Sequence, residues 1–393
     1  MNIQKPFSEQ HCWLGHDSGD FKIFEQIMQR STHAADVPLA MDIQKNVPFY
    51  EGAYVSKASG DATMRRDVLN EWMRVLANGA GIFIVKHGMK DLSIVDRATE
   101  IFEFLIEREK DAGGGDHFAE AGANDRVWNA LEKHCLHDPE NFVAYYACHS
   151  INIASEAWLG RGYQVTSQVN RVNPGGAAQT PHRDYHLGFM TVEEAMRYPS
   201  HVHALSAYLT LQGAVAHCDM PVESGPTQLL PFSQHFHEGY LAYGREEFQN
   251  YFARNFVQLA LEKGDLIFFN PAVMHAAGKN ATTDVFRIAN LLQISSAFGR
   301  AMETVNRHRI SLALYPALLK TKEQAALSET ELANAVFACA EGYSFPTNLD
   351  LDPPIDGCAP KTQAQFMIEA LEQGWSVGEF AAALDTLASR RQS

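Results

Sequence analysis

Between about Val165 and Ser296 the chain alternates short runs of β-forming residues with turns, and this pattern limits the fold more than any other feature. Glycine and proline separate the runs at residues 173–176, 224–226 and 263–265. Several short strands at this spacing indicate an antiparallel sandwich or jelly roll. The runs expected to form strands are Ala204–Leu211, Gln228–Pro231, Phe256–Leu261, Leu266–Phe269 and Val285–Ile294.

The residues on both sides of this stretch have mostly helical spacing. We therefore expect one mainly β core with flanking helices: residues 1–160 form a mainly helical N-terminal preface with one or more strands joining the core, 161–300 form the jelly-roll core, and 301–393 form a helical C-terminal tail. The expected elements before the core are helices at Phe21–Arg30, Asp61–Leu76 and Asp91–Lys110, a strand at Ile82–Val85, a loop at Ala112–Asp116 and a mainly helical stretch at Asn124–Trp158.

Composition and charge exclude several classes of protein. The 393 residues are 46% hydrophobic, which is typical of a globular chain that can bury a large core. The net charge of −15 disfavours binding to nucleic acid or to an anionic membrane surface. The chain has no apolar leader and no apolar stretch long enough to span a membrane, and its six cysteines are scattered. These features predict a cytoplasmic protein with reduced thiols.

Three residues form a candidate metal site. His182 and Asp184 are separated by one residue, so in a strand both would face the same side. A second His-x-Asp occurs at His217, and either pair alone could be a polar strand end. His275 follows the predicted strand Leu266–Phe269 and is the best third ligand. Two histidines and one carboxylate on one face are typical of non-haem Fe(II) oxygenases, although Zn²⁺ is an alternative.

Arg287 lies twelve residues after His275, among apolar neighbours in a predicted strand. An arginine in such a run is costly unless an anion meets it. Its guanidinium can bind a carboxylate through two parallel hydrogen bonds, so Arg287 could hold a dicarboxylate cosubstrate beside the metal. An internal salt bridge to Asp or Glu explains the pattern equally well.

Three ordered blocks resemble the phytanoyl-CoA dioxygenase (PhyH) family of Fe(II)/2-oxoglutarate-dependent oxygenases. The first block is Pro181-His182-Arg183-Asp184. The second runs from Glu223 to His235 and is similar to a family segment that contains Gly-Pro and then Pro-Gly-Ser-His. The third begins at Gly264 and continues through His275 to Arg287. Together they cover about residues 165–296, a third of the chain, and the resemblance does not explain the tail.

The resemblance implies a double-stranded β-helix (jelly roll, cupin-like) that uses Fe(II), 2-oxoglutarate and O2. It implies that His182, Asp184 and His275 are the catalytic iron ligands and that Arg287 holds the distal carboxylate of 2-oxoglutarate. The family has no metal ligands at the positions of His217 and Asp219, so we expect a structural role there. The chain departs from the family pattern at Phe232, which replaces the usual glycine and puts the geometry of that turn in question.

Weaker candidates surround these positions. Gln168, Asn170, Gln179 and Thr227 are candidate contacts to 2-oxoglutarate, but they could equally bond the backbone of the sheet. Tyr185 and His186 directly follow the acidic ligand. They could contact substrate, orient Asp184 or pack in the core.

We therefore expect an Fe(II)- and 2-oxoglutarate-dependent dioxygenase that hydroxylates a small organic metabolite and decarboxylates 2-oxoglutarate to succinate. The alternatives are a metal-dependent cupin-like enzyme that does not use 2-oxoglutarate, and a non-catalytic jelly-roll binding protein. The partner expected is a small polar molecule rather than a CoA thioester, nucleic acid or a membrane. The sequence leaves open the substrate, the type of oxidation and whether the tail caps the core or forms a homodimer.

Overall fold

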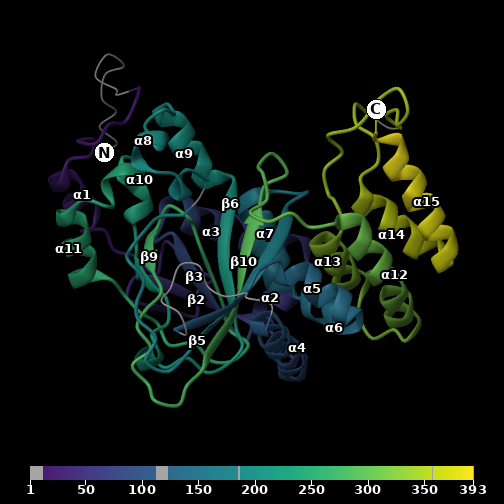
Figure 1. The fold of residues 1–393 in the computed structure, drawn as a ribbon, viewed down its shortest axis with the longest axis horizontal. Coiled ribbons are helices and arrows are strands. Elements are labelled where there is room, and N and C mark those ends of the chain that lie inside the picture. The colour runs from purple at the N-terminus through teal and green to yellow at the C-terminus, as the bar shows by residue number, and fades with distance from the viewer. Residues whose placement is uncertain (1–11, 112–122, 185, 356, 393) are drawn as a thin grey trace.

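The computed structural model describes residues 12–111, 123–184, 186–355 and 357–392. The loop expected at Ala112–Asp116 lies outside these ranges. None of the helices within them is long and apolar enough to cross a membrane. Figure 1 shows the sheets at the centre, with α1 and α11 at one end of the molecule and the C-terminal helices at the other.

The strands fall mainly in two groups, an N-terminal group before residue 130 and a core group after residue 160. Their bounds are β1 Asp42–Gln44, β2 Val47–Glu51, β3 Ile82–Lys86, β4 Asn124–Val127, β5 Gln164–Val172, β6 Thr210–Ala216, β7 Gln228–Leu230, β8 Leu266–Phe269, β9 Met274–Ala276 and β10 Arg287–Ser295.

The order of the core strands is that of a double-stranded β-helix. The described residues form one sheet in the order β1-β2-β3-β8-β6-β10-β5-β4 and a second, small sheet of β7 and β9. Isolated bridges add His182 beside β9 and Val257 beside β7. We number the strands in chain order from β5 as strand 1, and count the segments at His182 and Val257 as strands 2 and 5. The two layers then follow the orders 1-8-3-6 and 2-7-4-5. This confirms the predicted jelly roll.

Alternate side chains of the strands enter two separate cores. On β3, Ile82 and Ile84 pack between the two sheets, whereas Phe83 and Val85 pack under the helices. On β8 the same alternation sends Ile267 inward. Because β side chains point alternately to opposite faces, one apolar run supplies both cores. The inner core leaves room at one end for the cavity described below.

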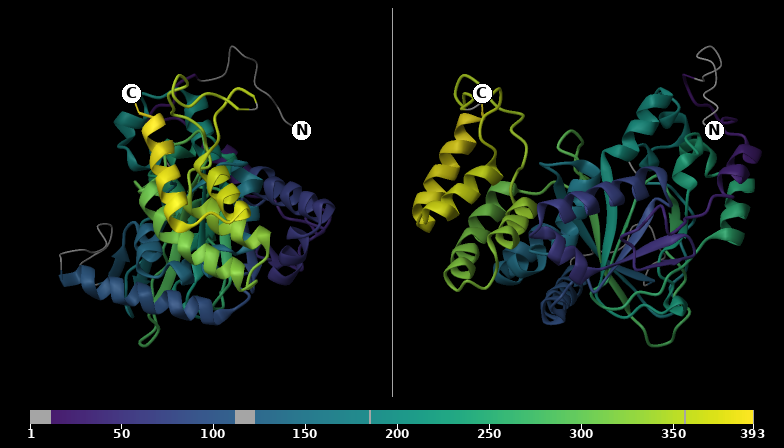
Figure 2. Two further views of the ribbon diagram at one scale, coloured as in Figure 1. Left: turned by 90° about the vertical axis from the view of Figure 1, so that its right-hand side faces the viewer. Right: turned by 180° about the vertical axis from the view of Figure 1, so that it is seen from behind.

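The helices lie mostly before and after the core strands, and Figure 2 shows α12–α15 gathered at one end. The tail packs on α5, α6 and α7 through α12 and α13. The bounds are α1 Phe21–Ile27, α2 Gly52–Ser59, α3 Ala62–Asn78, α4 Leu92–Asp111, α5 Ala130–His137, α6 Pro139–Tyr146, α7 His149–Leu159, α8 Val192–Ala195, α9 Ser200–Tyr208, α10 Gly239–Ala242, α11 Glu246–Asn255, α12 Arg307–Glu323, α13 Glu329–Cys339, α14 Gln363–Gln373 and α15 Val377–Arg390.

Local chemistry explains several of the helix boundaries. Asp61 accepts hydrogen bonds from the first turn of α3, and Pro139 occupies the first turn of α6, where its missing N–H costs nothing. Ser328, Thr362 and Ser376 each form a capping box at the start of a tail helix. These signals fix where the tail helices start.

Some expected elements were wrong in detail. Residues 204–208, expected as part of a strand, complete α9, because His203, Ser206 and Ala207 are buried at helical spacing. Phe256–Leu261 is not a strand but an extended segment with isolated bridges. Asn124–Val127, expected within a helical stretch, is β4, whose pairing with β5 overrides local preference.

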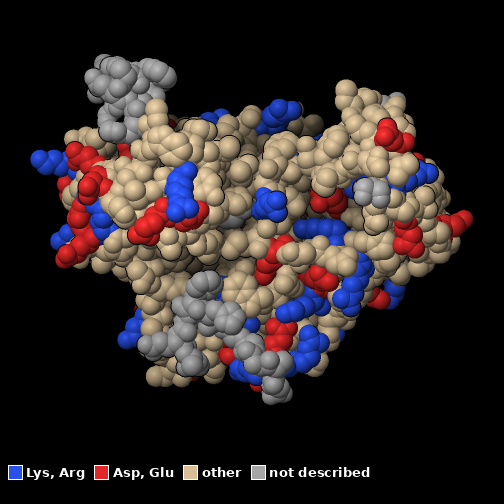
Figure 3. Space-filling model, turned by 45° about the horizontal axis from the view of Figure 1, so that its top comes forward, with Lys and Arg blue, Asp and Glu red and all other residues tan. Residues whose placement is uncertain are grey.

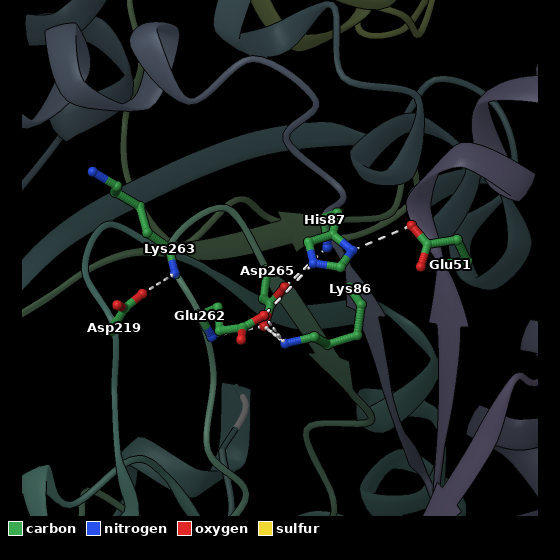
Figure 4. Close-up of polar contacts among 7 residues, drawn as sticks. All are labelled: Glu51, Lys86, His87, Asp219, Glu262, Lys263 and Asp265. Carbon is green, nitrogen blue, oxygen red and sulfur yellow. Dashed lines mark hydrogen bonds and ion pairs between the residues drawn. The ribbon is translucent and has the colours of Figure 1, made fainter.

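A charged cluster closes the turn before β8, and we call it the Asp265 cluster (Figure 4). Asp265 is fully buried and accepts hydrogen bonds from Lys86 Nζ at 2.6 Å, from the His87 backbone N–H at 2.9 Å and from the Glu262 backbone N–H at 2.7 Å. Lys86 also contacts Glu262 at 2.7 Å. Burial opposes the charge on Lys86, but its hydrogen bonds to Asp265 and Glu262 outweigh burial and raise its pKa.

Candidate metal centre and cosubstrate pocket

His182, Asp184 and His275 come together at one end of the jelly roll. His182 and His275 are paired across neighbouring extended segments, with backbone N–H···O distances of 2.9 and 3.0 Å. Asp184 follows two residues later, beyond the isolated bridge at His182 and outside any strand, so the predicted strand alternation is not what brings the two side chains together. Among the described residues, these three form the one group of metal-ligating side chains whose ligand atoms all lie within 4.8 Å of one another.

Each histidine ring is oriented by its own backbone. Nδ1 of His182 lies 2.9 Å from the carbonyl oxygen of Thr180, and Nδ1 of His275 lies 2.9 Å from that of Val273. A carbonyl can only accept, so each Nδ1 must carry the proton. The lone pair of each Nε2 is left for a metal. Burial and the neighbouring His275 lower the pKa of His182, which favours the neutral ring that coordination needs.

Asp184 is held by Gln212 on β6. The Nε2 group of Gln212 donates to Oδ2 of Asp184, and the two histidine Nε2 atoms lie 3.5 and 3.7 Å from the carboxylate oxygens. Burial opposes ionisation of Asp184, but its contact with His275, the nearby His182 and the Gln212 bond outweigh burial and lower its pKa to about 2. The carboxylate is therefore ionised at neutral pH.

This donor set fits a divalent metal. It offers two imidazole nitrogens and one carboxylate on a single side of the site, which leaves positions open for other ligands. A structural Zn²⁺ site takes four protein ligands, and the described residues offer no fourth side chain here. The donor set therefore excludes a structural zinc site and fits a catalytic metal with open positions, as Fe(II) has in non-haem oxygenases.

The triad opens into a cavity of about 410 Å³ between the two sheets. This volume lies at the lower end of the roughly 300–1,000 Å³ that small-molecule sites span. Its walls include each of the five predicted contacts to 2-oxoglutarate, namely Gln168, Asn170, Gln179, Thr227 and Arg287. The structure thus brings together residues that lie up to 119 positions apart in the sequence.

Arg287 is a buried cation in this cavity. It is 7% exposed, and one terminal nitrogen donates to the backbone carbonyls of Ser224 at 3.0 Å and Gly278 at 3.3 Å. Burial lowers its pKa to about 10, so it remains charged. None of the described carboxylates forms an ion pair with it. The internal salt bridge weighed from the sequence is therefore not found, and the guanidinium fits a carboxylate ligand.

The amides along the cavity wall differ in what they already bind. Oε1 of Gln168 accepts from Arg126 at 3.0 Å, and Oε1 of Gln179 accepts from the Ala277 backbone N–H at 3.3 Å. Oδ1 of Asn170 is buried without a hydrogen-bond partner among the described residues. A buried amide without a partner is unusual and points to a ligand.

The remaining candidates lie elsewhere. Tyr185 is outside the described residues. His186 is next to the cavity, but the lining includes Gly188 and Phe189 rather than His186, and burial lowers its pKa to about 4. His217 is buried away from the cavity between Thr99 and Tyr145, at 2.8 Å from each hydroxyl oxygen. Its surroundings match the structural role expected for it.

Sequence analysis missed several cavity residues. Gln212 and Gln293 lie opposite each other on β6 and β10, and both line the cavity. Arg126, Trp128 and Met302 also contribute to its lining. Both glutamines follow apolar residues within strands, but β10 also contains Arg287 and Asn290, so the sequence did not single them out. Residues such as Met302, on the loop after the core, carried no signal.

The turn after β7 has Phe232 at the position where the family pattern has glycine. Phe232 adopts a left-handed backbone with φ of 69°, a region that favours glycine. The side chain is 4% exposed, so its burial offsets the strain. Arg183, between the two metal ligands, donates to the carbonyls of Ser233 and Phe236, which ties this turn to the metal site.

The family model described as phytanoyl-CoA dioxygenase (PhyH) matches residues 86–289, which is 204 of the 393 residues. The chain belongs to the phytanoyl-CoA dioxygenase family. The matched range of this phytanoyl-CoA dioxygenase family member includes the triad and Arg287. Family and triad agree with the predicted cofactor class, a non-haem metal ion used together with 2-oxoglutarate. No curated protein sequence matches the chain.

Solved structures similar to this family member include enzymes described as non-haem and α-ketoglutarate-dependent. The carbocyclase SnoK from nogalamycin biosynthesis is 18% identical, covers 66% of this chain and 90% of its own, and has a TM-score of 0.44. The epimerase SnoN from the same biosynthesis is 18% identical, with coverage of 60% and 82% and a TM-score of 0.41. HygX from Streptomyces hygroscopicus, solved with nickel, 2-oxoglutarate and hygromycin B, is 12% identical, with coverage of 59% and 89% and a TM-score of 0.41.

Proposed function

We propose that this protein is an Fe(II)- and 2-oxoglutarate-dependent dioxygenase that hydroxylates a small polar organic molecule, with decarboxylation of 2-oxoglutarate to succinate. The observation that carries the proposal is the buried Arg287, which shares the cavity with the triad and has no carboxylate partner among the described residues. A cupin-like enzyme without a 2-oxo acid would need another anion to meet this guanidinium.

The protein's own residues bind and orient the reactants. His182, Asp184 and His275 would hold iron, which supplies the activation of O2 that amino-acid side chains cannot provide. Arg287 holds the distal carboxylate of 2-oxoglutarate through paired hydrogen bonds, and this places the 2-oxo end towards the triad. Apolar side chains of the cavity, such as Ile267 and Leu291, exclude water from the reacting groups.

The proposal is tested by anaerobic titration of the purified protein with Fe(II) and 2-oxoglutarate. A 2-oxo acid that chelates Fe(II) through two oxygens gives a weak visible charge-transfer band. We expect the band in the wild-type protein, its loss in His182→Ala and a higher 2-oxoglutarate concentration for half-saturation in Arg287→Met. Iron binding without any band would reject the 2-oxo acid, and the absence of metal binding would reject the enzyme altogether.

A further inference from the structure

Two glutamine side chains stand together on the cavity wall beside the metal site. Gln212 of β6 and Gln293 of β10 are directly opposite each other in the antiparallel ladder, so their side chains lie on the same face. Both line the cavity, and the Oε1 atom of each is buried without a hydrogen-bond partner among the described residues. Gln212 is 4% exposed.

The orientation of the Gln212 amide is fixed by its neighbour. The hydrogen bond between them runs from Nε2 of Gln212 to Oδ2 of Asp184, so the NH2 group of the amide faces the carboxylate. The amide oxygen therefore points away from Asp184 and needs a donor. 2-Oxoglutarate carries no N–H or O–H donor at neutral pH, so the cosubstrate does not meet this need. A buried acceptor left unsatisfied costs about 1–3 kcal/mol, which favours a ligand that donates to it.

The rest of the cavity defines the apolar part of that ligand. Ile267 and Phe269 of β8 and Leu291 of β10 line it with apolar surface, and Phe189, 48% exposed, lies at its edge. Phe269 is paired with Gln212 across β8 and β6, so apolar surface lies directly beside the amides on the same sheet. The volume of about 410 Å³ is shared with 2-oxoglutarate, so little space remains for a long acyl chain.

We propose that Gln212 and Gln293 form a substrate subsite for hydroxyl or amino groups, and that the substrate is a compact molecule with two neighbouring hydrogen-bond donors on a carbon skeleton. This inference rests on the proposed function, because the subsite is defined by its place beside the metal. Gln212 bonds a metal ligand with its NH2 and accepts from the substrate with its oxygen. The substrate is thereby held next to the iron.

The test compares two probes with the same carbon ring, one with two O–H donors and one in which both hydroxyls are methylated; Gln293→Leu separates the effect of the donors from that of the added methyl groups. trans-Cyclohexane-1,2-diol carries two neighbouring O–H groups, and trans-1,2-dimethoxycyclohexane keeps the oxygens but has no donor. Paramagnetic Fe(II) broadens the proton NMR signals of a probe that binds near it. Each protein is first loaded anaerobically with Fe(II) and 2-oxoglutarate, and the charge-transfer band is recorded before any probe is added.

We expect the wild-type holoprotein to bind the diol on the order of threefold to tenfold more tightly than the dimethoxy compound, as one or two hydrogen bonds predict. Gln293→Leu should remove most of this preference while keeping the band. Gln164→Leu is the matched control, because Gln164 of β5 lies outside the cavity lining and its amide donates to the carbonyls of Ser296 and Gly299, so its diol preference should stay at the wild-type ratio.

Two outcomes, each with the charge-transfer band present, would overturn the inference while the proposed function stands. The first is equal broadening of the signals of both probes by the wild-type protein. The second is no broadening of the diol signals up to the solubility limit of the diol. An unchanged preference in Gln293→Leu would also reject the subsite. Absence of the band itself rejects the proposed function, so the two failures are distinguishable.

Discussion

The Asp265 cluster and the metal cavity both lie against β8, yet they treat buried polar groups differently. In the cluster, Asp265 is surrounded by donors from Lys86 and from two backbone N–H groups. In the cavity, Arg287 meets only neutral carbonyls, and the oxygens of Gln212 and Gln293 meet nothing among the described residues. The polar groups of the cluster satisfy one another's hydrogen bonds, whereas those of the cavity need ligands to do so.

This difference separates stability from binding. Polar groups that satisfy one another contribute to folding, whereas groups that wait for a ligand lower the stability of the free protein and contribute on binding. On the face shown in Figure 3, basic and acidic side chains are intermixed. Substitutions in the two regions should therefore affect different measurements.

The largest effect is expected at Arg287. Arg287→Met removes two charge-assisted hydrogen bonds to 2-oxoglutarate, worth roughly 3–6 kcal/mol together, and should weaken its binding by at least about 100-fold. The free energy of unfolding without 2-oxoglutarate should change by no more than about 1 kcal/mol, because a desolvated charge disappears along with its bonds. Anaerobic titration and urea unfolding measure the two quantities. A large loss of stability would show that Arg287 contributes to folding, as the groups of the Asp265 cluster do.

Asp265→Ala should have the opposite signature. It leaves two backbone donors without their acceptor and takes from Lys86 the buried one of its two carboxylate partners, and we expect a loss of roughly 3–5 kcal/mol in the free energy of unfolding. The exposed Asp219 accepts one backbone N–H, from Lys263 at 2.9 Å, so Asp219→Ala is a matched control that should lose much less. Urea unfolding compares the two, and metal affinity should be retained in the folded Asp265→Ala protein. Equal losses in both variants would contradict the comparison.

Gln212→Met tests a cavity residue that also supports a metal ligand. The substitution keeps length and volume but removes the donor that orients Asp184, and loss of such a partner typically lowers metal affinity about 10–100-fold. Competition with a coloured chelator measures the affinity for Fe(II) under anaerobic conditions. Gln168→Met is the comparison variant, since Gln168 bonds Arg126 rather than a metal ligand. Similar metal affinities in wild type and Gln212→Met would show that the Gln212 donor does not support metal binding by Asp184.

The smallest effect concerns backbone strain beside the cavity, in the turn at Phe232. Phe232→Ala and Phe232→Gly both remove a buried ring, but only glycine adopts the left-handed backbone without cost. We expect Phe232→Gly to be more stable than Phe232→Ala by about 1 kcal/mol, the reverse of the usual order. Thermal unfolding of the two variants gives the difference. The usual order, with alanine the more stable, would mean that the turn changes its course.

The jelly roll and the central site could be predicted because their signals are local. His182 and Asp184 are separated by one residue, and Arg287 is conspicuous among apolar neighbours. Gln212 and Gln293 were missed because strand alternation does not tell which face meets the cavity, and their pairing needs the register of β6 with β10. The strands β1, β2 and β4 were missed for a related reason, since pairing across the sheet rather than local propensity stabilises them.

The tethering of both imidazole rings has a consequence for how the protein gains and loses its metal. Each ring is fixed by a carbonyl two residues earlier in its own segment, Thr180 for His182 and Val273 for His275. Hydrogen bonds that form during folding thus arrange the donor atoms before the metal arrives. The free energy of metal binding is therefore not needed to order the chain. In small zinc domains, by contrast, binding and folding are one event. Here a chelator should strip the site from an intact fold, so loading becomes a reversible exchange that follows the supply of iron.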